Sequence, residues 1–329
     1  MKSYGQCFAL LSVTAIVASA PAHAQNGTLT RSFVSSTGVD SNPCTITQPC
    51  ATFAHAYTTI GANGIIAALD PGRYGPMNIT GPVTINGNGW AAITAPANGS
   101  GITINADSSD NVVLKGLEID GAGAAHNGIT LNSAGSITVT DCILENFINE
   151  NINSQTTGNG ILLQPTSGTL AFTITNTTAS NSGYAGVSYF PPSGSPSANG
   201  TIDHVVANAD LYGINVNTAL ATGGTTVVTV SNSIASGNAN SGIVIGGGVS
   251  VAPVKASIDN VTVSSNVVGI TGLSSASILL GRSVITGNTD GVENGTPNTF
   301  YTYQDNRINL NGHDICVCGD GLNTTLALQ

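Results

Sequence analysis

The sequence has few charged residues and few aromatic residues. Its 329 residues include 7 Lys or Arg and 17 Asp or Glu, and aromatic residues make up 5% of the chain. Charged residues therefore reach 7%, whereas globular domains ordinarily carry roughly a quarter. A coiled coil or helical bundle is excluded, because those folds need Glu, Lys, Leu and Ala in bulk, and here Gly, Asn, Thr, Ser, Ile and Val dominate. Disorder is disfavoured, since 41% of the residues are hydrophobic and recur in short runs throughout the chain.

Basic residues are especially scarce, and the formal net charge is −10 at pH 7. A surface of this sign repels nucleic acids and other polyanions. The composition therefore predicts no nucleic-acid partner. It also predicts that a polyanionic substrate would need a bridging cation, with Ca²⁺ as the possible ion and no other cofactor expected.

Long hydrophobic runs are absent after the first two dozen residues. Lys2, the apolar stretch 8–18 and the small-x-small sequence Ala22-His23-Ala24 are typical of a signal peptide cleaved after residue 24. No later run approaches the 18 or so apolar residues of a membrane helix. We therefore expect a secreted protein, periplasmic or extracellular after cleavage, without transmembrane insertion.

Cysteines are few, and five remain after residue 24. Cys44 and Cys50 flank a short loop that contains Pro and Thr, and in an exported protein this spacing predicts a local disulfide. The odd number leaves at least one thiol without an intramolecular partner. The pairing of Cys142, Cys316 and Cys318 stays open.

What the sequence does contain is an internal repeat. A glycine followed by Ile or Val recurs at intervals of 22 to 32 residues, at Gly128, Gly160, Gly186, Gly213, Gly242, Gly269 and Gly291. Between these marks lie short alternating strands of Val, Ile and Thr, each followed by a turn rich in Asn. Such units are too short to bury an apolar side alone, so they must stack. The repeat lacks the Leu framework of leucine-rich repeats, and propeller blades need roughly 40 residues.

These features predict an all-β fold, a right-handed parallel β-helix of about nine coils with an N-terminal cap. The segment around 49–57 has a helical pattern and precedes the first strand-like run, so we expect a short helix in that cap. The expected organisation is a signal peptide (1–24), a cap and first strand (25–75), β-helix coils (76–318) and a C-terminal tail (319–329).

Several motifs resemble a known group of proteins. The residues Ser36-Thr37-Gly38, Pro49-Cys50-x-Thr52-Phe53 and Asp70-Pro71-Gly72-Arg73-Tyr74, with the ending Tyr301-x-Tyr303-x-Asp305-Asn306, resemble secreted right-handed parallel β-helix proteins of the pectate-lyase-like superfold, in a largely uncharacterised bacterial branch. The resemblance covers nearly the whole mature chain. It implies the fold and leaves the activity open, because the superfold includes lyases, hydrolases, esterases, epimerases and non-catalytic adhesins.

Stacking of the repeats suggests one candidate catalytic site. Aligning the segments 112–120 and 137–145 places Asp120 and Glu145 in neighbouring coils of one column, with Lys115 and Asp141 close by. Two carboxylates at strand spacing can share Ca²⁺ or act as an acid/base pair. His126, in the intervening turn, is a second candidate base. The alternative is a surface ladder of polar turn residues without chemistry.

Two other motifs are weaker. Asn288-Thr289-Asp290-Gly291 resembles the Asn-Thr-Asp motif of polygalacturonases, but the paired Asp-Asp and the other partners of that family are missing, so we interpret it as a turn. The segment 313–318, His-Asp-Ile-Cys-Val-Cys, offers metal ligands without the usual Cys-x-x-Cys spacing. We expect oxidised or unpaired thiols there and no metal site.

Aromatic residues provide a candidate binding surface. Tyr184, Tyr189, Phe190 and Tyr212 fall in consecutive coils and would make a platform for stacking sugar rings if they are exposed. The alternative is aromatic packing beneath the proline-containing loop 190–197.

The leading functional hypothesis is a secreted or envelope-associated protein that binds a glycan or a surface partner without catalysis. It rests on the missing catalytic sets and on the acidic surface with few charges. The first alternative is a polysaccharide lyase or glycoside hydrolase acting on an acidic polysaccharide, and the second is a structural, self-associating stalk.

Overall fold

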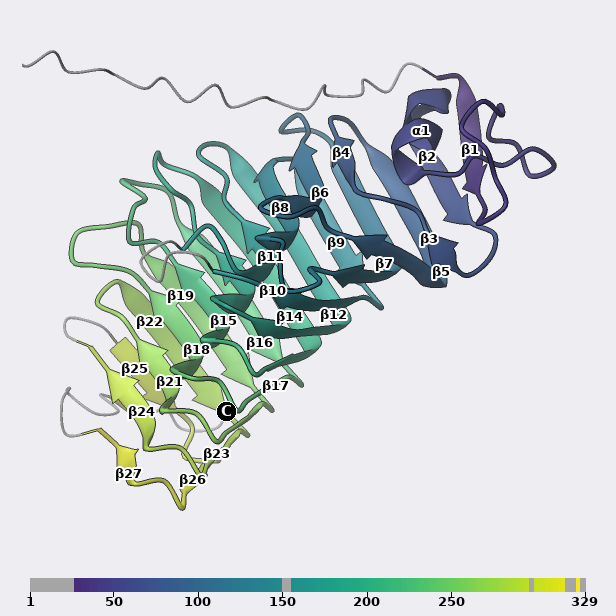
Figure 1. Cartoon of the computed structure of the whole chain (residues 1–329). Helices are drawn as coiled ribbons and strands as arrows, with labels where there is room; N and C mark the ends of the chain where they lie inside the picture. The colour runs from purple at the N-terminus through teal and green to yellow at the C-terminus, as the bar shows by residue number, and fades with distance from the viewer. Residues whose placement is uncertain (1–26, 150–154, 296–298, 317–323, 326–329) are drawn as a thin grey trace, which may run out of the picture.

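The computed structural model describes residues 27–149, 155–295, 299–316 and 324–325 (Figure 1). The predicted signal peptide and nearly all of the predicted tail lie outside these residues. Within them, one helix and 28 strands are stacked into a long solenoid, drawn from purple to yellow in Figure 1. No helix in these ranges has both the length and the apolar character needed to cross a membrane.

The larger sheet has 18 strands, all in parallel pairs. One stack of hydrogen-bonded strands runs along the solenoid as β1 (Leu29–Val34), β2 (Ile60–Ala68), β5 (Val83–Thr94), β7 (Asn111–Asp120), β9 (Ser136–Thr140), β12 (Thr169–Ser182), β14 (Ser197–Asn208), β16 (Thr226–Ser231), β19 (Val254–Asp259), β22 (Ala276–Gly281), β25 (Thr299–Thr302) and β28 (Thr324–Thr325). A second stack comprises β3 (Gly72–Arg73), β10 (Ile143–Phe147), β17 (Ile234–Ser236), β20 (Thr262–Ser264), β23 (Val284–Thr286) and β26 (Arg307–Asn309). The long strands β5, β7, β12 and β14 run through both stacks and join them.

A separate sheet of ten parallel strands closes each coil. Its order is β4 (Met77–Ile79), β6 (Ser100–Asn105), β8 (Asn127–Ser133), β11 (Asn159–Leu163), β13 (Ala185–Tyr189), β15 (Tyr212–Asn217), β18 (Ser241–Gly246), β21 (Val268–Gly272), β24 (Asp290–Asn294) and β27 (His313–Ile315). The predicted right-handed parallel β-helix is confirmed. The ten strands of this sheet compare with the about nine coils expected from the repeats.

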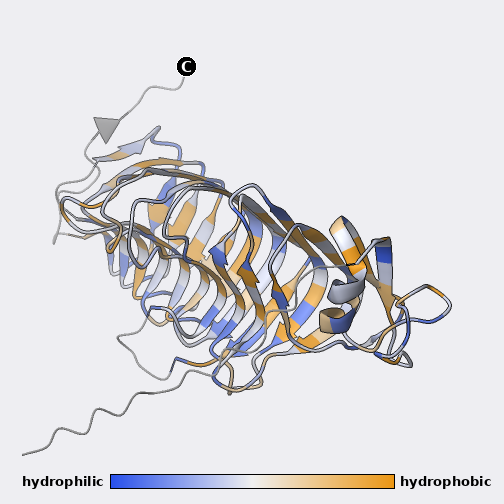
Figure 2. Cartoon of the chain, turned by 90° about the horizontal axis from the view of Figure 1, so that it is seen from above, coloured by the Kyte–Doolittle hydropathy of each residue, from blue (hydrophilic) through white to orange (hydrophobic). Residues whose placement is uncertain are grey.

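Stacked apolar side chains form one continuous core. A single interior row follows the register from Ile85 through Leu114, Val139, Ile174, Ile202, Val230 and Ile258 to Leu280, and every member is fully buried. Each such side chain contributes roughly 1.5–3 kcal/mol of burial free energy. Figure 2 shows the hydrophobic residues along the strands that line the stack. The alternation of apolar and polar residues in each strand therefore places polar residues on the outer faces.

One corner of seven successive coils has the left-handed backbone conformation. Each residue that follows the outward row Lys115, Thr140, Thr175, Asp203, Ser231, Asp259 and Gly281 has a positive φ: Gly116, Asp141, Asn176, His204, Asn232, Asn260 and Arg282. Gly and Asn tolerate this region best, which explains why Asn recurs at these turns. Asn260 donates its amide to Asn232 Oδ1 over 2.7 Å, so the corner also carries part of an amide ladder.

The N-terminal cap is also confirmed. The helix α1 (Phe53–Thr59) begins at Thr52, whose side chain accepts the His55 amide at 3.1 Å, and it buries Phe53 and Tyr57 against the first coil. The predicted Cys44–Cys50 disulfide is present and ties the preceding loop together. Strands β1 and β2, on either side of this loop and helix, already belong to the large sheet.

A buried amide ladder runs inside the solenoid near a second corner. The backbone amides of Asn238, Asn266 and Asn288 each donate to the side-chain oxygen of the next Asn along the axis, and the side-chain amides of all three donate to backbone carbonyls. Asp210 occupies the next position toward the N-terminus. Its Oδ1 accepts the Ser182 amide at 2.7 Å, whereas Oδ2 is buried without a hydrogen-bond partner among the described residues.

Burial raises the pKa of Asp210 well above its ordinary value of 3.8. Above that ordinary value the unfolded chain releases a proton that the folded chain retains, so stability falls as pH rises toward the folded pKa. We predict that Asp210→Asn raises the free energy of unfolding at pH 7 by about 1–3 kcal/mol. The Asn side chain carries no charge to bury, and its amide nitrogen can donate a hydrogen bond where Asp210 Oδ2 has no partner among the described residues. Urea unfolding at pH 7 and pH 4 measures this, and the gain should shrink at the lower pH. A variant less stable than the wild type at pH 7 would contradict the prediction.

Candidate functional site

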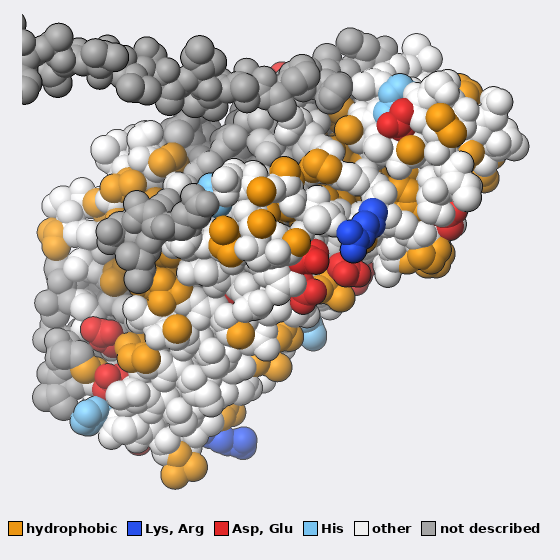
Figure 3. All heavy atoms as spheres, in the orientation of Figure 1, with side chains coloured by type: hydrophobic (Ala, Val, Ile, Leu, Met, Phe, Trp, Pro, Cys, Tyr) orange, Lys and Arg blue, Asp and Glu red, His pale blue; other side chains and the backbone are white. Residues whose placement is uncertain are grey.

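The predicted alignment of Asp120 and Glu145 is confirmed by the strand register. The two residues are direct partners between β7 and β10, and both side chains are half-buried. Asp120 Oδ1 accepts the Ala122 amide at 2.8 Å and the Asn146 side-chain amide at 2.9 Å. Figure 3 shows acidic side chains grouped over these strands beside a basic one. At Asp120 the structure therefore shows the polar ladder that was the alternative interpretation, while an acid/base role stays a prediction.

The other predicted members of this site are spread around it. Lys115 Nζ lies 3.7 Å from Asp141 Oδ2 in an ion pair whose side chains are about half exposed, so its contribution to stability is small. His126 lies immediately before β8, on the ten-stranded sheet and beyond the corner that follows Asp120. The sequence reasoning missed Glu118, an exposed carboxylate two residues before Asp120 on β7. Among the described residues, the carboxylate oxygens of Glu118, Asp120 and Glu145 do not gather within 4.8 Å of one another, so no calcium site is formed by the three together.

Two substitutions test the ladder role of Asp120. Asp120→Asn should leave the free energy of unfolding nearly unchanged, because the amide oxygen can still accept from Ala122 and Asn146. Asp120→Ala removes both hydrogen bonds and should lower it by about 1 kcal/mol. Urea denaturation compares the two variants, and equal losses would show that the hydrogen bonds to Asp120 do not stabilise this corner.

The predicted aromatic platform is divided by the fold. The placement of Tyr189 on a binding surface is wrong: it occupies an interior row between Leu163 and Val216, is 1% exposed, and packs against Phe172 with ring centroids 5.9 Å apart. Tyr184 and Tyr212 instead meet edge to face, with centroids 5.2 Å apart. The neighbouring Phe190 is 3% exposed and belongs to the packed interior of this region.

The Tyr184–Tyr212 pair lines a pocket of about 360 Å³ on the outer side of the ten-stranded sheet. The described lining residues also include Gln155, Asn215, Asn217, Asn240, Ser241, Val244, Thr271, Leu273 and Glu293. This volume lies within the roughly 300–1,000 Å³ of small-molecule sites. Among the described residues, the lining contains one carboxylate, from Glu293, and no Lys or Arg.

Hydrogen bonds connect the polar groups of this pocket. Asn240 Nδ2 donates to the Tyr212 hydroxyl at 3.3 Å, Ser241 Oγ donates to Asn240 Oδ1 at 3.2 Å, and Ser241 and Thr271 share a hydrogen bond of 3.0 Å. Asn215 Nδ2 donates to Ser188 Oγ at 3.2 Å. Because these partners come from successive strands, the stacking of coils holds the pocket in shape.

Two outward-pointing side chains at this pocket are buried. Ser188 and Asn215 lie in an outward row, yet they are 0% and 1% exposed. Desolvation also raises the pKa values of Tyr184 and Tyr212 above the ordinary 10, so both remain neutral phenols at neutral pH. Neutral hydroxyl and amide groups in a shielded site are suited to hydrogen bonding with an uncharged polar ligand.

The end of the same sheet carries further titratable groups. Asp290 Oδ1 lies 2.9 Å from His313 Nδ1 in the next coil. Glu293 on β24 is the strand partner of Thr271 on β21. Figure 3 shows acidic side chains and a histidine near β24 and β27. Asn288 belongs to the buried ladder, and Asp290 and Gly291 already belong to β24, so only the first half of the predicted turn 288–291 lies outside a strand.

The remaining cysteines offer neither a metal site nor a reactive nucleophile among the described residues. A metal site in the segment 313–318 is disfavoured, because Cys316 is disulfide-bonded and its sulfur is not a free thiolate. The other cysteine of that segment, Cys318, lies outside the described residues. Cys142 is a buried free thiol whose pKa rises to about 11 through desolvation, so it is not a reactive nucleophile near neutral pH.

The fold and these sites define a right-handed parallel β-helix protein with a shielded polar pocket. No protein-family model matches the chain, and no curated protein matches it. Among solved structures, pectate lyase Pel9A aligns with a TM-score of 0.45 at 16% identity over 88% of this chain and 73% of that chain. The A-module of the mannuronan C-5 epimerase AlgE6 of Azotobacter vinelandii aligns with a TM-score of 0.29 at 13% identity, over 81% of this chain and 91% of that chain. At these values the comparisons say nothing about activity, and the fold assignment rests on the strand pairing.

Proposed function

We propose that this protein binds a glycan in the pocket formed by Tyr184, Tyr212, Asn215, Asn240 and Glu293. The observation that carries the proposal is the pairing of two tyrosine rings with a connected set of amide and hydroxyl groups in one shielded pocket. Sugar rings present apolar C–H faces to aromatic rings and hydroxyl groups to amides and carboxylates.

The charge of the lining favours an uncharged sugar unit. Glu293 would accept hydrogen bonds from sugar hydroxyls, and the described lining offers no cation to neutralise a uronic acid. Burying an unpaired carboxylate of the ligand beside Glu293 would be costly. The proposed ligand is therefore a neutral saccharide, and the proposed activity is binding without chemical change.

The binding experiment uses the mature chain and neutral and acidic oligosaccharides: cellohexaose, xylohexaose, mannohexaose and trigalacturonate. Isothermal titration should show binding of at least one neutral probe, and Tyr212→Ala should weaken it about tenfold or more, because the ring and its hydrogen bond to Asn240 are lost. Trp90→Ala removes an exposed aromatic residue elsewhere and should leave the affinity unchanged. Equal affinity in the wild type and Tyr212→Ala would contradict the proposal.

Catalysis is the second candidate function, favoured by the nearby Asp290–His313 pair and Glu293. The binding proposal predicts no new reducing ends and no unsaturated product from pectic, alginate or neutral polysaccharides, with or without Ca²⁺. Product formation would instead establish an enzyme. Its loss in Glu293→Gln, Asp290→Asn or Asp120→Asn would then locate the catalytic group, because an amide cannot exchange the proton.

A further inference from the structure

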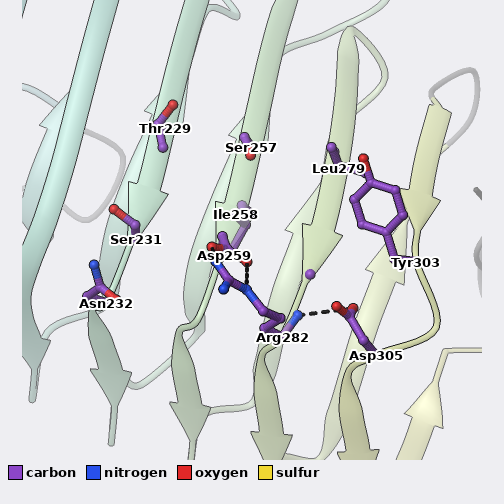
Figure 4. Close-up of a pocket in the computed structure, with 11 residues that line it drawn as sticks. Thr229, Ser231, Asn232, Ser257, Ile258, Asp259, Leu279, Arg282, Tyr303 and Asp305 are labelled. Carbon is purple, nitrogen blue, oxygen red and sulfur yellow. Dashed lines mark hydrogen bonds and ion pairs between the residues drawn. The ribbon is translucent and has the colours of Figure 1, made fainter. Parts of the chain in front are cut away.

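A second groove lies on the outer face of the large sheet, where β16, β19, β22 and β25 stack (Figure 4). Its volume is about 690 Å³, and a smaller hollow of about 310 Å³ borders it along the same strands. The two hollows share Thr229, Ser257 and Leu279. They therefore form one continuous depression, distinct from the pocket on the ten-stranded sheet.

An ion pair between Arg282 and Asp259, which lie in adjacent coils, lines one side of this groove. Arg282 Nε donates to Asp259 Oδ1 at 2.9 Å, and Arg282 Nη2 contacts Asp259 Oδ2. The backbone amide of Arg282 donates to Asp305 Oδ1 at 3.1 Å. These contacts fix a guanidinium and two carboxylates in adjacent coils, as Figure 4 shows. Three of the five guanidinium N–H groups are not used by these two contacts with Asp259.

The backbone of Arg282 supports a role beyond stability. Its φ is 49°, in the corner column where Asn232 and Asn260 occupy the equivalent positions of the two preceding coils. Asn tolerates this conformation better than Arg does. A long charged side chain in an unfavourable backbone conformation, on the wall of a groove, is the kind of local conflict that accompanies binding sites.

Tyrosine side chains line one side of the groove, and a glycine leaves space free beside them. Tyr303 lies beside Leu279 in Figure 4, and Tyr301 lines the adjoining hollow. Gly281 also lines the groove, in a row where other coils carry Thr140, Thr175, Asp203 and Ser231. A Cβ at Gly281 would lie 3.2 Å from Asp259 Oδ1 and 3.8 Å from the Tyr303 ring. The absence of a side chain therefore keeps the space between the aromatic ring and the carboxylates open.

The charges of the groove balance. Lys255 and Arg282 supply two positive charges, and Asp259 and Asp305 supply two negative charges. Such a surface presents hydrogen-bond donors and acceptors together, beside an apolar ring, and this combination matches vicinal hydroxyl groups on a sugar ring better than it matches a polyanion.

We propose that this groove is a second glycan-binding site, which takes a neutral oligosaccharide by stacking a sugar ring on Tyr303 and hydrogen-bonding its hydroxyls to Arg282, Asp259 and Asp305. The site does not depend on the function proposed for the Tyr184–Tyr212 pocket. Since the two sheets bury their inner faces against a common core, their outer faces point away from each other. A chain with both sites would link two glycan strands.

The test uses the mature chain with Tyr212→Ala as background, so that binding in the first pocket is weakened and failure of either proposal is recognised separately. Cellohexaose, xylohexaose and mannohexaose are titrated by calorimetry. At least one probe should bind, and Gly281→Thr should weaken it about tenfold or more by filling the open centre with a residue that this row accepts elsewhere. Arg282→Asn should weaken binding to a similar extent while thermal stability is kept or raised, because Asn suits the backbone conformation and extends the amide ladder.

Arg307→Gln is the matched control, since it removes an exposed arginine outside the groove and should change the affinity by less than about twofold. Raising the salt to about 0.5 M should have equally little effect, because a neutral ligand brings no charge to screen. Tyr303→Ala provides a further variant should one of the others fail to fold.

Three results would overturn the proposal. The first is the absence of binding by every neutral probe in the Tyr212→Ala background. The second is an unchanged affinity in both Gly281→Thr and Arg282→Asn. The third is binding of trigalacturonate alone, abolished by Lys255→Gln, which would show an acidic ligand instead.

Discussion

The parallel hydrogen bonding between successive coils is the constraint on which the rest of this structure depends. Each strand repeats the direction and the register of the strand one coil earlier, at a spacing of about 4.8 Å. A side chain that points inward therefore lies above another inward side chain, and the same holds for the outer face. The row from Ile85 to Leu280 shows the result, since eight residues from eight coils become a single buried stripe.

The same stacking explains why polar side chains are ordered in columns. Because the register repeats, the backbone amides of Asn238 and Asn266 donate to the side-chain oxygen of the next Asn along the column. At Asp210 the column continues with a carboxyl group in place of an amide. The outer corner has a positive φ throughout, with Asn at three positions, Gly, Asp and His at three others, and Arg282 beside Asp259. Departures from an otherwise regular column thus identify residues whose presence stability alone does not explain.

The two candidate binding surfaces differ in the polar and charged groups that line them. The described lining of the Tyr184–Tyr212 pocket contains amides, hydroxyls and one carboxylate. The groove at Arg282 lies on an open face and holds charges of both signs. Both place an aromatic ring next to hydrogen-bonding groups that come from different coils. Neither surface contains an excess of cations, which agrees with a chain of net charge −10 and with ligands that are not polyanionic.

The sequence by itself determined the repeat, the alternation of buried and exposed residues, the Cys44–Cys50 pairing and the alignment of Asp120 with Glu145. These features are local or follow from one fixed period, so they can be derived without coordinates. The tertiary structure decided the rest. Coil lengths vary, with 28 residues from Asn238 to Asn266 and 22 from Asn266 to Asn288, so contacts such as Arg282 with Asp259 follow from no constant spacing. Tyr189 and Tyr212 look equivalent in the sequence, yet one occupies an interior row and the other a pocket, because a strand turns successive side chains to opposite faces and only the paired register shows which face is buried.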